Sequence, residues 1–148
     1  MTTRRQFLHA SLAGTGLLLA GSALGSPGPY AAAAAAVSGP HLYGAVFETA
    51  WVPSAAFGAA AARRGLATFA IGDDVTPVWR QVNDLWQKRP VAISGLTTLT
   101  PLLLLEQSAR DHGLRVVSRE RHPATGRGQA TLYSWVLAPR PALHGANA

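Results

Sequence analysis

The chain of 148 residues contains no cysteine and only seven acidic residues. Without cysteine it cannot form a disulfide, use a thiolate nucleophile or attach a c-type haem. Its stability must therefore come from the burial of apolar side chains. The composition provides them, because hydrophobic residues make up 48% of the chain and charged residues 14%. This balance is typical of a folded protein with one apolar core.

Motifs that would name a reaction are also missing. There is no phosphate-binding P-loop, and Gly126-x-Gly128 lies in an expected hairpin, so it is no dinucleotide fingerprint. The net charge of +6 comes without a dense Lys/Arg cluster, which argues against nucleic-acid binding. The histidines beyond residue 40 show no metal-site spacing; they are His41, His112, His122 and His144. We expect neither a metal site nor nucleic-acid binding, and the sequence leaves any cofactor unknown.

The first 36 residues differ in composition from the rest. Thr3-Arg4-Arg5-Gln6-Phe7-Leu8 precedes an apolar stretch that is free of acidic residues and broken by glycines, and the alanine run 31–36 follows. Such a stretch is typical of a secretory signal and too interrupted for a membrane span. The segment resembles the bacterial twin-arginine signal peptide. This resemblance implies recognition of Arg4 and Arg5 by the twin-arginine translocase and a periplasmic location, with membrane attachment only if the leader stays uncleaved.

Beyond the leader, short apolar runs alternate with helical patterns. Pro53, Pro77 and Pro101 recur 24 residues apart, each just inside an expected helix start, where the missing N–H of proline costs nothing. Gly65 and Gly113 follow the expected helix ends. The expected strands are 41–48, 66–71, 90–94, 114–118 and 129–137, and the expected helices are 53–64, 76–89 and 100–112.

Three strand-loop-helix units and a final hairpin predict an α/β fold. We expect a small doubly wound three-layer sandwich whose mostly parallel sheet has about five strands in the order 2-1-3-4-5, with strand 5 antiparallel. In outline this resembles the flavodoxin-like and Rossmann-like group, and residues 41 to 122 resemble small exported bacterial α/β proteins, which implies no known activity. The expected organisation is a signal peptide and alanine-rich joint at 1–36, one α/β domain at 37–138 and a disordered tail at 139–148.

Ligands of open parallel sheets gather at the carboxyl ends of the strands, where the strand order reverses. In the expected order this crevice lies between strands one and three, and the loop 95–100 would offer N–H groups and a helix N-terminus to an anion. The basic end of the hairpin would lean over it. In the alternative interpretation the threonines only cap the helix and the basic residues protect an edge ribbon. The candidate ligand-binding residues are Glu48, Thr49, Trp51, Asp73, Ser94, Gly95, Thr97, Thr98, Arg119, Arg121 and His122.

These features predict an exported, non-enzymatic protein that binds a small anion or an exported partner protein. The alternative is a small hydrolase or acid/base enzyme that uses Glu48 and the loop 94–98. A triad of Ser94, His122 and either Asp73 or Asp74 lacks the Gly-x-Ser-x-Gly elbow that would support it. No catalytic residue is therefore assigned.

Overall fold

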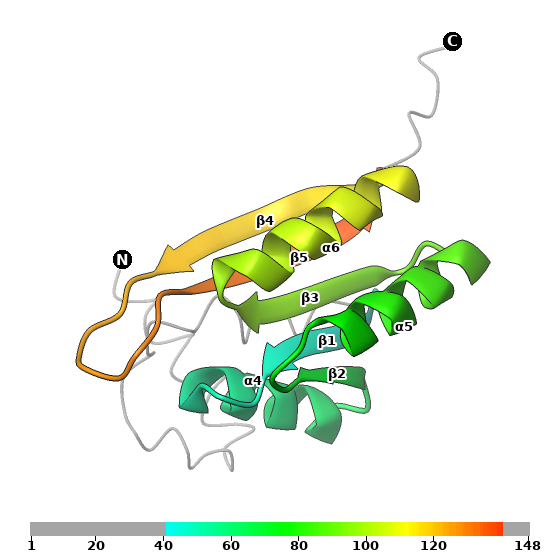
Figure 1. Cartoon of the computed structure of the whole chain (residues 1–148). Coiled ribbons are helices and arrows are strands. Elements are labelled where there is room, and N and C mark those ends of the chain that lie inside the picture. The colour runs from blue at the N-terminus through cyan, green and yellow to red at the C-terminus, as the bar shows by residue number, and fades with distance from the viewer. Residues whose placement is uncertain (1–40, 141–148) are drawn as a thin grey trace, which may run out of the picture.

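The computed structural model describes residues 41–140 (Figure 1). In it, helices start and end at the prolines and glycines from which the sequence predicted helix ends. Pro53 and Pro77 are each the second residue of a helix, Pro101 is the third, and Gly113 follows the last helix with a φ of 80°. The predicted leader and residues 141–148 of the predicted tail lie outside the described residues. The elements are β1 (Leu42–Glu48), α4 (Val52–Arg63), β2 (Ala67–Ile71), α5 (Thr76–Lys88), β3 (Ala92–Thr97), α6 (Leu99–Asp111), β4 (Leu114–His122) and β5 (Leu132–Pro139).

Strand β3 is longer than the sequence predicts. Gly95, Leu96 and Thr97, which we expected in a threonine-rich loop, continue the strand and pair with β5. Leu96 and Thr97 are fully buried, so their backbone groups need partners that only the sheet supplies. The expected loop before α6 thus shrinks to Thr98 alone.

The sheet has the order β2-β1-β3-β5-β4, so the predicted order 2-1-3-4-5 is wrong in its last two strands. The parallel pairing of β1 with β2 and β3 and the antiparallel direction of β5 are confirmed. Side chains explain why β5 is the inner strand. Its Leu132, Trp135 and Leu137 are buried, whereas residues 117–121 of β4 are all exposed. An apolar strand needs a neighbour on each side, and a charged strand resists further pairing at an edge.

Helices pack on both faces of this mixed sheet, as Figure 1 shows. Val46 of β1 belongs to a cluster with Val82 of α5 and Leu102 of α6. The preceding Ala45 packs instead with Phe57 of α4. Because successive strand residues point to opposite faces, α5 and α6 cover one face and α4 lies on the other. Among residues 41–140, no helix combines the length and apolarity that a membrane crossing requires.

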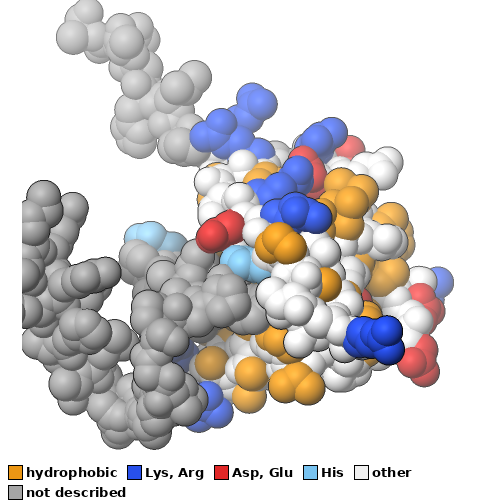
Figure 2. Space-filling model, turned by 90° about the vertical axis from the view of Figure 1, so that its left-hand side faces the viewer, with side chains coloured by type: hydrophobic (Ala, Val, Ile, Leu, Met, Phe, Trp, Pro, Cys, Tyr) orange, Lys and Arg blue, Asp and Glu red, His pale blue; other side chains and the backbone are white. Residues whose placement is uncertain are grey.

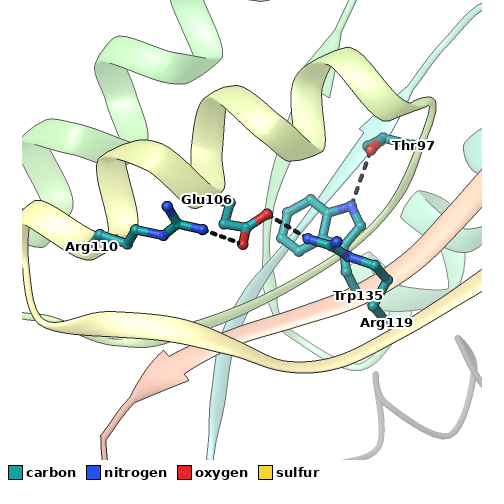
Figure 3. Close-up of polar contacts among 5 residues, drawn as sticks. All are labelled: Thr97, Glu106, Arg110, Arg119 and Trp135. Carbon is teal, nitrogen blue, oxygen red and sulfur yellow. Dashed lines mark hydrogen bonds and ion pairs between the residues drawn. The ribbon is translucent and has the colours of Figure 1, made fainter.

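Gly95 allows the indole of Trp135 to lie directly against β3. The two residues oppose each other across the β3–β5 pair, and a Cβ added to Gly95 would stand 2.1 Å from the indole ring. The indole N–H donates to Oγ1 of Thr97 at 3.0 Å (Figure 3). The side chain is 1% exposed, so the ring has no room to move away. This close approach helps to fix the register of β5 on β3.

We therefore expect Gly95→Ala to lower the free energy of unfolding by about 3 kcal/mol, because the added methyl group overpacks a closed core. Gly72→Ala is the matched control, since a Cβ there meets nothing within 4 Å and the residue has no positive φ. The control should change stability by less than about 0.5 kcal/mol. Urea denaturation of both variants measures the difference, and equal losses would contradict the packing argument.

Candidate binding site at the carboxyl edge of the sheet

The side chain of Glu48, the last residue of β1, is bonded to the start of α6. The backbone N–H of Thr98 donates to its Oε2 at 2.5 Å, and the Thr98 hydroxyl donates to its Oε1 at 3.1 Å. A carboxylate here satisfies a free N–H at the helix start and interacts favourably with the helix dipole. The contact joins residues 50 positions apart in sequence. Glu48 therefore caps α6 from another strand.

Ser54 makes a second connection between β1 and β3. Its Oγ accepts from the backbone N–H of Glu48 at 2.7 Å and donates to the carbonyl oxygen of Leu96 at 2.5 Å. Thr49 ties the same end of β1 to β2, because its N–H and its hydroxyl both donate to the Ile71 carbonyl, at 2.9 and 3.2 Å. The carboxyl ends of all three parallel strands are thus held together by polar side chains.

These bonds bear on the predicted anion crevice between β1 and β3. Thr98 N–H, the donor expected to meet a free anion, already has a carboxylate partner. A free anion would have to displace a group that is covalently tethered beside the site and therefore present at high effective concentration. The geometry corresponds to the capping interpretation of the threonine loop.

The remaining predicted residues of β3 face the interior. Ser94 and Thr97 are 0% exposed. Thr97 Oγ1 accepts from Trp135 and donates to the Thr98 carbonyl at 2.9 Å. Ser94 Oγ is buried and has no hydrogen-bond partner. None of these groups is presented at the surface of the sheet edge.

The two aspartates of the β2–α5 loop stand apart from this cluster. Asp74 accepts hydrogen bonds from Thr76 N–H at 2.9 Å and from its hydroxyl at 2.8 Å. The backbone hydrogen bond, then the side-chain one, lowers the pKa of Asp74 below its usual 3.8. Asp74 therefore caps α5 as a carboxylate, while Asp73 is exposed in the same loop.

The basic residues of β4 do not converge on one point. Arg119 forms an ion pair with Glu106 of α6, which also holds Arg110 at 2.9 Å (Figure 3). Arg121 is exposed on the same side of the strand, two residues further on. His122 points to the other face, where its Nε2 lies 2.8 Å from Ser134 Oγ and the side chain is 4% exposed.

The sheet order also separates the residues of the conceivable triad. Asp73 and Asp74 follow β2, whereas His122 ends β4, and these are the two edge strands. Strands β1, β3 and β5 lie between them. The aspartates, Ser94 and His122 therefore do not form a charge-relay arrangement.

A cavity of about 360 Å³ opens between the β1–α4 turn and the loop 123–131 that joins β4 to β5. It lies at the carboxyl edge of β1 and β3, since Leu132 at the start of the antiparallel β5 is part of its wall. Of the predicted site residues that the structure describes, Trp51 lines this cavity. The lining residues are Ala50, Trp51, Val52, Pro53, Pro123, Thr125, Gly128, Gln129, Ala130 and Leu132.

Figure 2 looks onto this end of the molecule. Lys and Arg side chains gather at the top of the view and recur at its lower left and lower right, and much of the described surface between them is hydrophobic or white. None of the lining residues among 41–140 is charged. The described lining is thus uncharged, while Lys and Arg side chains lie elsewhere on this face of the molecule.

Sequence reasoning missed the hairpin-loop half of the cavity. It treated residues 123–128 as a turn and expected β5 to start at Gln129, but β5 begins at Leu132 and leaves a longer connection. Pro123 and the glycines of the loop could have indicated a longer irregular connection, because such residues are typical of turns and loops. Nothing in them indicated a neighbour in the β1–α4 turn.

Within the described part of the chain, no group of three or more histidine, aspartate or glutamate side chains is placed to share a metal ion. The chain matches no model of a known protein family, and comparison with curated proteins and with solved structures finds no similar protein. The cavity and the bonds around it are therefore the basis for any functional argument.

The capping role of Glu48 can be tested by substitution. We expect Glu48→Ala to lower the free energy of unfolding by about 1 to 2 kcal/mol, because α6 loses its acceptor and β1 loses its link to α6. Glu48→Gln, which keeps an acceptor oxygen, should lose about half as much. Glu120→Ala, at an exposed position of β4, is the control and should change stability by less than about 0.5 kcal/mol. Equal stability of the Glu48 and Glu120 variants in chemical denaturation would refute the capping role.

Proposed function

We propose that this chain is an exported binding protein that holds a small, uncharged molecule in the cavity between the β1–α4 turn and the hairpin loop. The carrying observation is the cavity itself, about 360 Å³ in volume and lined by uncharged side chains at the carboxyl edge of the sheet. Small-molecule sites are concave, mostly apolar and of this size, and open α/β sheets place them at this edge.

The uncharged side chains that line the cavity among the described residues support an uncharged ligand. A charged group that enters such a cavity loses hydration and finds no counter-ion among Trp51, Pro53, Pro123 and Leu132. An uncharged molecule loses far less and gains apolar contact. A small anion, the ligand first expected, would be better placed near the arginines of β4, but Arg119 is already paired with Glu106.

An enzyme that uses Glu48 and the 94–98 segment as acid or base has less support. Both carboxylate oxygens of Glu48 accept hydrogen bonds from Thr98, and Glu48 does not line the cavity. A general acid or base must be within hydrogen-bond reach of a substrate proton. We therefore favour ligand binding over catalysis at the carboxyl edge of the sheet.

Export by the twin-arginine route and a periplasmic location are part of the proposal. Their support is the leader sequence, in which Arg4 and Arg5 precede an apolar stretch without acidic residues. The doubly wound, flavodoxin-like interpretation of the fold is also proposed, supported by helices on both faces of the sheet.

The binding proposal predicts that uncharged small molecules raise the melting temperature and that filling the cavity abolishes the effect. Ala130→Phe places a ring in the cavity wall, whereas Ala124→Phe puts the same ring in the same loop outside the lining. A panel of neutral amides, lactones and alcohols is tested by thermal shift, since a ligand that binds only the folded state must stabilise it. Stabilisation that survives in Ala130→Phe, or none from any compound, would reject the cavity as the site.

The export proposal predicts that the conservative double variant Arg4→Lys/Arg5→Lys accumulates in the cytoplasm of a bacterial host, because the charge is kept but the arginine pair is lost. Arg63→Lys/Arg64→Lys changes an adjacent arginine pair outside the leader and should leave export intact. Immunoblots of periplasmic and cytoplasmic fractions measure the distribution. Equal periplasmic amounts of both variants would rule out twin-arginine export.

A further inference from the structure

Three of the four tryptophans in the chain have a hydrogen-bond acceptor for the indole N–H. Trp79 donates to Ser108 Oγ at 2.7 Å, and Trp86 donates to the Val91 carbonyl at 3.0 Å. Trp135 donates to Thr97. The N–H of the fourth, Trp51, has no acceptor among residues 41–140. Trp51 is also the tryptophan that lines the cavity.

The position of Trp51 is fixed although its N–H is unpaired. It is the residue immediately before α4, with extended backbone at φ −117° and ψ 121°, and its carbonyl accepts from Ala55 N–H at 2.9 Å. Its ring packs against the cluster that contains Phe57, Leu96 and Leu132. A half-buried indole held in this way offers a flat apolar surface and one directed donor.

Gln129, on the hairpin-loop side of the cavity, offers a second donor. The Thr125 N–H and hydroxyl both donate to its Oε1, at 3.1 and 2.7 Å. Because a backbone N–H can only donate, the atom facing it must be the carboxamide oxygen, which fixes the orientation of the group. The carboxamide NH2 has no acceptor in the described part of the chain. Gln129 is exposed, so this donor is open to solvent at the cavity rim, opposite the donor of the half-buried Trp51.

We propose that the cavity takes an uncharged ring compound with a carbonyl acceptor, whose ring lies on the Trp51 indole and whose oxygen accepts from Trp51 Nε1–H or Gln129 Nε2–H. The inference rests on the proposed function and narrows it to a ligand class. The walls formed by Pro53, Pro123 and Leu132 contribute apolar contact. A ligand acceptor restores the hydrogen bond that Trp51, unlike the other three tryptophans, lacks.

Benzamide is the probe, because it combines an uncharged ring with a carbonyl acceptor; benzoate adds a charge and toluene removes the acceptor. Each is titrated into the 15N-labelled full chain, and the four indole N–H resonances are followed by NMR. We expect benzamide to shift the resonance that disappears in Trp51→Phe, and to bind about tenfold more weakly to that variant, the equivalent of about 1.4 kcal/mol for one lost hydrogen bond. Benzoate and toluene should each bind more weakly than benzamide.

Trp79→Phe is the control, because Trp79 lies on α5 and does not line the cavity. It should leave benzamide affinity unchanged. If benzamide shifts the backbone N–H resonances of Ala130 and Leu132 while the Trp51 indole resonance stays unmoved, the ligand class is wrong and the cavity still binds. If benzamide shifts no resonance, the inference is overturned, and the Ala130→Phe thermal-shift test decides separately whether the cavity binds any neutral molecule.

Discussion

The contact between the Glu48 carboxylate and Thr98 organises the carboxyl edge of the sheet. It satisfies the start of α6 with a group from β1, so that strand end and helix start are held at one position. Ser54 extends the connection by bridging the Glu48 N–H and the Leu96 carbonyl. Since Ser54 lies in the first turn of α4, these bonds also fix the residues just before it, among them Trp51.

The inner position of β5 has an equally direct consequence for the cavity. Because β5 pairs with β3, its first residue, Leu132, lies beside the carboxyl end of β3. The loop that enters β5 is therefore brought next to the β1–α4 turn, and the two segments enclose the cavity. In the order 2-1-3-4-5 the loop would enter one strand further from β1. The strand order thus places Leu132 and the end of the loop beside the β1–α4 turn.

Polar groups at this edge fall into two sets. The first set makes hydrogen bonds that connect neighbouring strands and helices and so stabilise the fold. Its members are Glu48, Thr49, Ser54 and Thr97. Trp51 and Gln129 retain donors without acceptors in the described chain and line the cavity. The Trp51 indole is half-buried and the Gln129 carboxamide is exposed, so both donors are accessible to a molecule that enters the cavity.

The sequence by itself determined the elements of this fold and their order along the chain. Prolines that a helix tolerates only in its first turn, and a glycine that can adopt positive φ after a helix, are local constraints that act within a few residues. Only the tertiary structure decided that β5 lies inside β4, that Glu48 caps a helix 50 residues away and that the hairpin loop faces Trp51. The physical reason is the separation in sequence of the residues that interact. Which strand is buried, and which carboxylate finds a free N–H, depend on neighbours that folding brings together and that no short stretch of sequence contains.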